Sequence, residues 1–287
     1  LQRQVAISER ELETVREQLN ESQQREWVIN RNDIQILEQE LGHGAWGFVY
    51  RGKFHGCDVA VKQMHENLIT SDYTRHAFER EVGMASRCRH PCLLQFIGAT
   101  TDERPLLVTE ILDCSLREKL NNEDVTPLSA NEVPVISRDV ALGLNYLHQQ
   151  PIPIIHHDVS SANVLLWRQS DRWRAKVSDY GTANFVRQSN INYAGAAIYS
   201  APEFLNENHD QPISCKVDVY SFGVLLCEMC IRQEPDPQRR RRQIAAIRNG
   251  HFRGLVERCV HEVPGMRPNM ESIIEELNPG EASESRI

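Results

Sequence analysis

The chain lacks a long hydrophobic run: none of its 287 residues belongs to an apolar stretch of the roughly 18 residues that a membrane-spanning helix needs. It does not begin with a basic segment followed by an apolar one, so we expect no secretory signal. Positive charge is scarce as well, with 32 Lys and Arg against 40 Asp and Glu and a net charge of −8. Because nucleic-acid phosphates are bound by basic surfaces, this balance argues against nucleic acid as the main partner.

The eight cysteines lack the regular spacing of a disulfide framework. In a chain without a secretory signal, this predicts reduced thiols and a cytoplasmic location. Cys227 and Cys230 form a Cys-x-x-Cys pair inside the apolar run SFGVLLCEMCI. Because no second pair completes a zinc site, this context favours buried helix residues over a metal or redox pair.

One dense basic run interrupts the acidic balance, namely RRRR at residues 239–242. The simpler interpretation is a solvated helix face, since that is the usual role of a run of like charges. The alternative is a docking patch for an acidic partner.

The composition changes along the chain in a way that predicts two lobes. Short alternating runs rich in Val, Ile and Phe fill residues 34–110, with one helical stretch near 72–88, which predicts a small β-sheet lobe with a single helix. Longer helical patterns dominate residues 111–278, the clearest being 130–148 and 217–230. The expected fold class is therefore α+β and bilobal, with a mainly α second lobe and a ligand site in the cleft between the lobes.

The two ends of the chain fall outside these lobes. Residues 1–25 carry apolar side chains at heptad a and d positions, namely Leu1, Val5, Leu12, Val15 and Leu19. This pattern predicts a short coiled-coil helix, through which the chain would form a homodimer. Two serines interrupt that seam, so an isolated or frayed helix is the alternative. Residues 279–287, which begin with Pro and Gly, are expected to form a disordered tail.

A glycine triplet marks the start of the first lobe. Gly42, Gly44 and Gly47 form a G-x-G-x-x-G pattern in LGHGAWGFVYRG. A dinucleotide-binding turn has the same spacing but opens a helix, whereas FVYRGKFHGCDVAVK reads as a strand, a turn at His55–Gly56 and a second strand. We therefore expect a hairpin whose backbone amides fold over phosphates, in preference to an ordinary hairpin tip.

A lysine follows on the second strand of that hairpin. Lys62 ends the segment VAVK after alternating apolar side chains, so we expect it to project from a strand into the cleft. A lysine withdrawn from water needs an anion. Glu81, in the helical segment HAFEREVGM, is the predicted partner and a bound phosphate the second, while a solvated surface lysine is the alternative.

Together with HHDVSSAN (156–163), SDYG (178–181) and SAPE (200–203), these segments resemble the eukaryotic protein-kinase catalytic domain in order and spacing. The resemblance covers residues 34–278. HPCLLQFIGA and DVYSFGVLLCEM are most similar to the tyrosine-kinase-like group of Ser/Thr kinases. The resemblance implies the bilobal kinase fold, ATP and Mg²⁺ as cofactors, and a protein substrate.

The resemblance also implies roles for individual residues. Asp179 would hold Mg²⁺, Asn163 would serve the second metal position, and Asp158 would be the catalytic base toward a substrate hydroxyl. Thr109 would be the gatekeeper behind the adenine, and the ribose contact stays open between Asp113 and Ser115. The implied ATP-binding residues are Leu41, Gly42, Gly44, Gly47, Val49, Ala60, Lys62, Thr109, Glu110, Leu112 and Leu165. Implied structural residues are Tyr180, which keeps an aromatic ring beside Asp179, the buried pair Glu203–Arg267, and Asp218 as a brace of the catalytic-loop backbone.

Three departures from the family pattern cluster around the catalytic loop. His157 replaces the Arg that usually precedes the catalytic Asp, so we expect activity that does not depend on phosphorylation of the activation segment, at Thr182, Ser189 or Tyr193. Ser160 and Ala162 leave out the Lys and Arg that face the transferring phosphate in Ser/Thr and tyrosine kinases. Ala196 replaces the Thr that contacts that Lys.

Two functions remain open at this stage. One is an ATP- and Mg²⁺-dependent protein kinase that phosphorylates Ser or Thr at a reduced rate. The other is a nucleotide-binding pseudokinase that acts as an allosteric partner. The presence of Lys62, Asp158 and Asp179 favours the kinase, while the uncharged VSSA segment favours the pseudokinase. A third interpretation makes the coiled coil the main element and the kinase-like domain its dimerised cargo.

Overall fold

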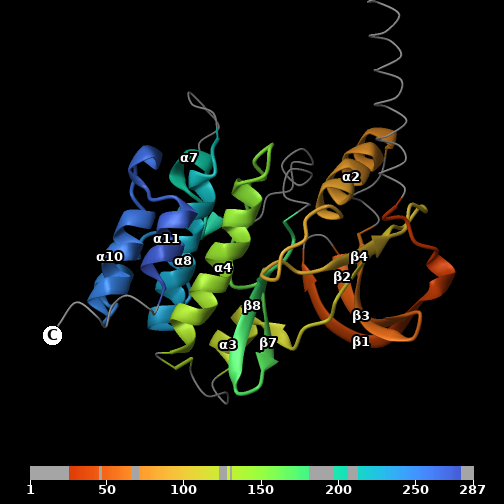
Figure 1. The fold of residues 1–287 in the computed structure, drawn as a ribbon, viewed down its shortest axis with the longest axis horizontal. Helices are drawn as coiled ribbons and strands as arrows, with labels where there is room; N and C mark the ends of the chain where they lie inside the picture. The colour runs from red at the N-terminus through yellow and green to blue at the C-terminus, as the bar shows by residue number, and fades with distance from the viewer. Residues whose placement is uncertain are drawn as a thin grey trace, which may run out of the picture. The chain divides into compact units, whose positions relative to one another are not determined.

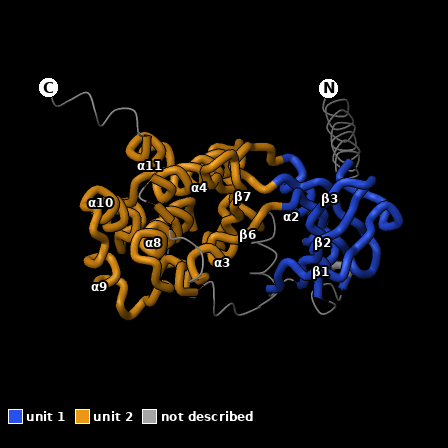
Figure 2. Tube along the Cα trace, turned by 90° about the horizontal axis from the view of Figure 1, so that it is seen from below, with its two compact units in different colours: residues 1–87, 95–111 blue, residues 88–94, 112–287 orange. Residues whose placement is uncertain are grey.

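The computed structural model describes residues 26–44, 47–65, 71–122, 128–129, 131–180, 197–205 and 213–278, apart from a few side chains that include Glu81. The chain divides into two compact units (Figure 2), the first made of Leu1–Arg87 and Gln95–Ile111 and the second of Cys88–Leu94 and Leu112–Ile287. The predicted bilobal α+β fold is confirmed. The predicted coiled coil at 1–25 and the tail at 279–287 lie outside the described residues.

The described residues of the first unit form a five-stranded antiparallel sheet and the α-helix α2 (Figure 1). The strand order is β1-β2-β3-β5-β4. The strands are β1 (Ile34–Gly44), β2 (Gly47–Phe54), β3 (Cys57–Met64), β4 (Phe96–Ala99) and β5 (Leu106–Thr109), preceded by the 3₁₀ turn η1 (Arg31–Asp33), with the helix α2 (Asp72–Ala85) between β3 and β4.

The sheet forms because its strands alternate apolar and polar side chains. Val59 and Val61 of β3 pack with Leu106 and Val108 of β5 in a buried cluster. The predicted turn between β2 and β3 is confirmed. Its two residues, His55–Gly56, have φ of +47° and +84°, the positive values that a two-residue hairpin requires.

The helix α2 begins where a capping box closes its first turn. The Ser71 hydroxyl accepts from the Thr74 amide at 3.2 Å, and the Thr74 hydroxyl accepts from the Ser71 amide at 3.1 Å. These bonds satisfy two backbone donors that a helix start leaves open. Phe78 and Val82, one turn apart, are buried. The predicted helix near 72–88 is therefore confirmed.

The second unit is mainly helical and carries one small antiparallel sheet of order β6-β7-β8. Its strands are β6 (Cys114–Ser115), β7 (Val164–Gln169) and β8 (Arg172–Val177). Its helices are α3 (Leu116–Asn121), α4 (Glu132–His148), α7 (Pro202–Leu205), α8 (Lys216–Ile231), α9 (Arg240–Ala245), α10 (Gly250–Cys259) and α11 (Met270–Glu276), with the 3₁₀ turn η2 at Pro264–Met266 (Figure 1).

The helix α8 is apolar around its circumference and lies in the core of the second unit. Its packing against α10 is close: a Cβ added to Gly223 would lie 2.6 Å from the Cβ of Cys259. Burial raises the pKa of the thiols of Cys227 and Cys230 to about 11 and about 12, respectively. Cys227 is buried and Cys230 half-buried within α8, which agrees with the prediction that this Cys-x-x-Cys pair consists of packed helix residues.

Two further features concern the described residues alone. Within them, no group of three or more His, Cys, Asp or Glu side chains is arranged to hold a metal ion. Every helix in that part of the chain falls short of the length and apolar character that crossing a membrane requires.

Candidate active site

The register of the first unit brings four predicted ATP-binding residues to one face of the sheet. Val49 pairs with Lys62, and Ala60 pairs with Thr109. Paired residues of antiparallel strands share a face, and Ala60 and Lys62 alternate with the core residues of β3. These four side chains therefore line the face opposite the buried cluster. Leu41 lies in β1 where the pairing with β2 is irregular, between Glu40 and Gly42.

The three glycines differ in what their surroundings require. Gly47 has φ of +148°, and an added Cβ would lie 1.8 Å from the Gln63 carbonyl oxygen, so the pairing of β2 with β3 itself demands glycine. An added Cβ at Gly42 or Gly44 meets no atom within 4 Å. Packing among the described residues therefore does not explain these two glycines. The close approach of a phosphate group to the backbone would explain them, since only glycine leaves its amide uncovered by a side chain.

A histidine that the sequence analysis did not single out contacts this hairpin. His65, just after β3, places Nε2 3.1 Å from the Gly44 carbonyl oxygen. Because a carbonyl only accepts, Nε2 must carry the hydrogen. The ring also meets Phe48 edge-on, with 5.2 Å between centroids. His65 thus joins the end of β3 to the strand that carries the glycines.

At the end of β5, the predicted adenine contacts take part in local hydrogen bonds. The Glu110 amide donates to the Gln95 carbonyl at 3.0 Å, and the Glu110 carboxylate accepts from the Gln95 amide at 2.7 Å. The Thr109 hydroxyl donates to the Glu110 carbonyl at 3.1 Å. The amide of Glu110 is therefore committed to the fold, and its carbonyl is the main-chain group that could meet an adenine.

Two predicted ribose contacts lie in the second unit. Asp113 Oδ2 accepts from the Arg168 amide at 2.8 Å. The Ser115 hydroxyl caps α3 by accepting from the Glu118 amide at 3.1 Å. Both side chains thus make hydrogen bonds that stabilise the local fold, so the ribose contact stays open between Asp113 and Ser115. Leu112 begins this part of the second unit. Leu165 lies in β7, half-buried between the buried Val164 and Leu166.

The catalytic loop of the second unit holds Asp158 and Asn163 together. Asn163 Nδ2 donates to Asp158 Oδ2 at 2.7 Å and to the Asp158 carbonyl at 2.9 Å. Since the amide nitrogen is used in this way, Asn163 Oδ1 is the atom left to face a metal ion. Carboxylate and amide oxygens are the ligands that Mg²⁺ prefers, so these residues fit the expected cofactor.

Asp179 is tied to the same loop through its neighbour. The amide and hydroxyl of Ser178 donate to the Asn163 carbonyl at 2.8 and 3.0 Å. Asp179 and His157 have φ of +57° and +63°, a region that costs side-chain-bearing residues free energy. The structure thus joins Asn163 directly to Asp158 and, through Ser178, to the segment that carries Asp179, with a positive φ at Asp179 and at His157.

His156 is a second residue that the sequence analysis did not assign, and it lies fully buried at the centre of this loop. Its Nδ1 accepts from the Asp158 amide at 3.2 Å, and its Nε2 donates to the Ser178 carbonyl at 2.7 Å. The two bonds define the neutral tautomer that carries its hydrogen on Nε2. One imidazole therefore links the base residue to the segment that carries Asp179.

Asp218 braces the loop from below, as predicted. Its buried carboxylate accepts from the amides of His156 and His157 at 2.8 and 2.9 Å, and lies 2.8 Å from His148 Nε2. Burial alone would raise the pKa of this carboxyl, but the hydrogen bond from His148 and the nearby histidines outweigh it and lower the pKa. The carboxylate therefore stays ionised beneath the catalytic loop.

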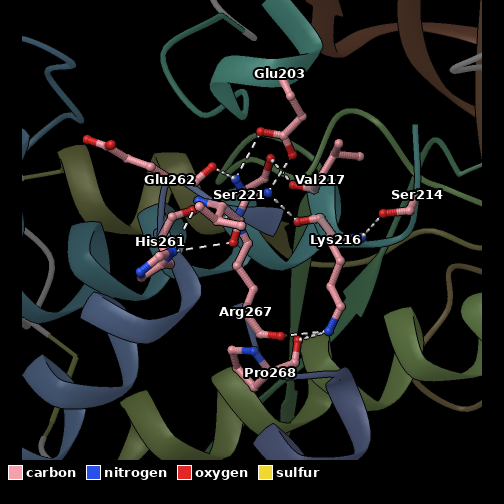
Figure 3. Close-up of polar contacts among 10 residues, drawn as sticks. Glu203, Ser214, Lys216, Val217, Ser221, His261, Glu262, Arg267 and Pro268 are labelled. Carbon is pink, nitrogen blue, oxygen red and sulfur yellow. Dashed lines mark hydrogen bonds and ion pairs between the residues drawn. The ribbon is translucent and has the colours of Figure 1, made fainter. Parts of the chain in front are cut away.

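The predicted pair of Glu203 and Arg267 is confirmed, and Figure 3 shows it at the centre of a larger network. Arg267 Nη1 and Nη2 donate to the two Glu203 oxygens at 2.5 and 2.9 Å. The same guanidinium donates to the carbonyls of His261 and Lys216 at 2.8 and 2.9 Å. Lys216 Nζ in turn donates to the carbonyls of Arg267 and Pro268 at 2.6 and 2.9 Å. This network ties α7 to the start of α8 and to the segment before α11.

The uncharged serines of the catalytic loop point inward. Ser160 and Ser161 are buried. Ser161 Oγ donates to Glu228 Oε1 at 2.9 Å and lies 3.0 Å from the Tyr199 hydroxyl, which donates to Glu228 Oε2 at 2.7 Å. Arg117 approaches Ser161 Oγ at 3.4 Å. We name this group of Ser161, Tyr199 and Glu228 the hydroxyl–carboxyl cluster. Sequence reasoning missed it because its members lie far apart in the chain.

Some of the predicted features fall outside the described residues. Ala196 and the candidate phosphorylation sites of the activation segment lie outside the described residues, as does the side chain of Glu81. Tyr180, which replaces the usual Phe, is described: it is buried, and its hydroxyl donates to the Leu94 carbonyl at 2.8 Å. This bond is one that a phenylalanine could not make.

The comparison with known families gives this arrangement its context. The sequence profile described as "Protein kinase domain" matches residues 36–278. The chain belongs to the protein kinase family. Among curated proteins, this kinase domain is similar to the dual specificity protein kinase shkB of Dictyostelium discoideum, at 35% identity over 73% of this chain and 32% of that protein.

Two further relatives extend the comparison. The serine/threonine-protein kinase CTR1 of Arabidopsis thaliana is 32% identical over 89% of this chain and 33% of its own length. The dual specificity protein kinase shkC of Dictyostelium discoideum is 30% identical over 84% of this chain and 50% of its own length. The chain thus spans about a third to a half of the length of these three relatives.

Proposed function

We propose that this kinase domain binds ATP with Mg²⁺ and transfers the γ-phosphate to Ser or Thr hydroxyls of a protein substrate, at a reduced rate. The observation that carries the proposal is the bonding of the Asn163 amide to Asp158, together with the bonds from Ser178 to the Asn163 backbone. These bonds orient the Asp158 carboxylate and the Asn163 side chain as the transfer would require. Relatives named as serine/threonine kinases support the class of substrate.

The roles of the residues follow from their chemistry. Asp158 would accept the proton of the substrate hydroxyl, and the Asn163 bond to Oδ2 orients its carboxylate for that step. Asn163 Oδ1 and the Asp179 carboxylate would hold Mg²⁺, which when bound neutralises charge on the phosphates. Lys62 would pair with the phosphates and with Glu81. Gly42 and Gly44 would leave backbone amides open to the phosphates.

The reduced rate follows from the missing cation. Ser160 occupies the position at which Ser/Thr kinases carry a Lys, and it is only 4% exposed. Removing one group that stabilises developing charge costs about 10²–10³ in rate in other enzymes. We infer a deficit of that order here. We also assign the domain to the tyrosine-kinase-like group, on the motifs named above and the similarity to CTR1.

Intact-mass measurement after incubation with Mg-ATP tests the transfer. We expect increments of phosphate mass in the parent chain and none in Asp158→Asn. The matched control Asp171→Asn, at the exposed turn between β7 and β8, should gain phosphate as the parent does. Increments in Asp158→Asn equal to those of the parent would refute the role of Asp158 and point to a contaminating kinase.

The second candidate is a nucleotide-binding pseudokinase, which the inward-facing serines favour. Thermal melting with and without Mg-ATP separates the two, because a ligand that binds the folded state raises the melting temperature. Stabilisation without any mass increment, in the parent and in Ser160→Lys alike, would establish the pseudokinase. A homodimer through residues 1–25 remains a separate proposal, which sedimentation of the chain with and without those residues would test.

A further inference from the structure

An exposed set of arginines covers α9 and the turns beside it. The side chains of Arg239, Arg241, Arg242 and Arg248 are exposed, and we call them the arginine surface. Arg239 pairs with Asp236 at 3.4 Å, with its own side chain 74% exposed. Such an exposed pair contributes little free energy. Within the part of the chain that the structure describes, no carboxylate pairs with the other three arginines.

A hollow of about 230 Å³ opens in the arginine surface. On the helix side it is lined by Arg239, Arg242, Gln243 and Ala246, and on the other side by the loop 233–236. Two arginines, Arg242 and the Asp236-paired Arg239, therefore line one hollow. A solvated helix face would expose its arginines separately and would have no reason to enclose such a hollow.

The walls of the hollow are fixed by buried hydrogen bonds. Gln243, 8% exposed, donates from Nε2 to the Glu234 carbonyl at 2.8 Å and accepts at Oε1 from the Asp236 amide at 3.0 Å. Ile244 and Ile247 are buried beneath the helix. The loop and the helix are thus held together before any partner arrives, which lowers the entropic cost of binding.

The same helix is anchored on its other side. Arg240 donates from Nη2 to the Ile198 carbonyl at 2.5 Å, next to Tyr199 of the hydroxyl–carboxyl cluster. One arginine of the run is therefore structural, while its neighbours face solvent. This division distinguishes Arg240 from the arginine surface and predicts that the surface can be altered without loss of the fold.

We propose that the arginine surface binds an acidic peptide segment of a protein partner. The guanidinium fork matches carboxylate and phosphate oxygens with two parallel hydrogen bonds. Glu234 and Asp236 in the opposite wall of the hollow would repel a continuous phosphate backbone. A peptide with acidic side chains at intervals fits this pattern of charges better than nucleic acid.

Fluorescence anisotropy with the full chain, without ATP, tests the proposal independently of catalysis. The probes are labelled peptides of about 12 residues built from Glu and Ser, the same peptide with phosphoserine, and a single-stranded RNA of similar length. We expect both peptides to bind, and binding to weaken between about 50 and 200 mM salt, since exposed charges are screened. Tighter binding of the phosphopeptide would identify phosphate as the preferred anion.

Matched variants locate the site. Arg239→Glu with Arg242→Glu should weaken peptide binding by at least about tenfold, equivalent to about 1.4 kcal/mol. The control Arg172→Glu, at the exposed start of β8, should change it by less than about twofold. Equal losses in both variants, no binding of either peptide, or RNA that binds more tightly than the peptides would each overturn the proposal. Unchanged melting temperatures would show that the variants remain folded.

Discussion

Replacing Tyr199 by Phe should destabilise the second unit in a pH-dependent way. Tyr199 and Ser161 each have one hydroxyl hydrogen, and both are donated to the Glu228 carboxylate, at 2.7 and 2.9 Å. The two hydroxyl oxygens also lie 3.0 Å apart without a hydrogen left between them. Phe fills the same space but takes one of the two donors from a buried carboxylate, so Oε2 loses its bond.

The sign of the effect follows from the pKa of Glu228. Burial raises this pKa, against the lowering effect of the hydrogen bonds from Tyr199 and Ser161 and the charge of Arg117, while Glu234 raises it further. A pKa above the unfolded value means that stability is fully present below the unfolded pKa and is lost as pH rises through the folded pKa. Phe at 199 removes one lowering bond, so it raises the folded pKa further and deepens that loss.

The magnitude can be bounded from the two protonation states. At low pH a neutral hydrogen bond is lost, at a cost of about 1 kcal/mol, and at high pH a bond to a charged group is lost, at about 1.5–3 kcal/mol. Urea unfolding of the parent and Tyr199→Phe at steps from about pH 5 to pH 8 should therefore show a difference that grows with pH. In a Glu228→Gln background the growth should vanish. A difference that stays constant with pH in the parent background, or a growth with pH that persists in the Gln background, would refute the reasoning.

Four further substitutions probe the two units separately. Gly47→Ala should lower the free energy of unfolding of the first unit by about 3 kcal/mol or more, since its Cβ would meet the Gln63 carbonyl at 1.8 Å. Gly44→Ala should change the free energy of unfolding in urea by no more than about 0.5 kcal/mol but weaken Mg-ATP binding. Equal stabilities of the two variants would contradict this. His65→Phe should keep the contact with Phe48 and weaken Mg-ATP binding several-fold in titrations, because it loses the donor to Gly44; unchanged affinity would dismiss His65 as a positioning residue. Asp218→Asn should cost about 3–5 kcal/mol in urea unfolding, since one carboxylate oxygen becomes a donor facing amide donors; a cost below about 1 kcal/mol would show that the brace contributes little.

Local patterns in the sequence were enough to predict the elements and several contacts. The alternation in β3, the turn at His55–Gly56 and the apolar run of α8 each depend on near neighbours, and the structure confirms them. The pair of Glu203 and Arg267 and the bracing role of Asp218 were implied by the family resemblance, and they are also confirmed.

The contacts that were missed depend on residues brought together by the fold. The hydroxyl–carboxyl cluster joins residues 38 and 67 positions from Ser161, and no local pattern marks any of its members. His65 contacts Gly44 only because β2 and β3 pair in one register. The role of His156 depends on which ring nitrogen carries the hydrogen, and that is set by the Ser178 carbonyl.

The departures at the catalytic loop concern charge, and the hydrogen bonds between Asn163 and Asp158 are present beside them. The Ser160 carbonyl accepts from the Asn163 amide at 3.1 Å, and the Ser161 hydroxyl is spent on Glu228. An unpaired buried polar group is costly whether or not the site is used, so these bonds stabilise the loop independently of its activity. Here these bonds are present, and the position where Ser/Thr kinases carry a Lys is occupied by the uncharged Ser160. The contribution that the family pattern leads us to expect, and that this loop lacks, is therefore electrostatic, while the hydrogen bonds between Asn163 and Asp158 remain in place.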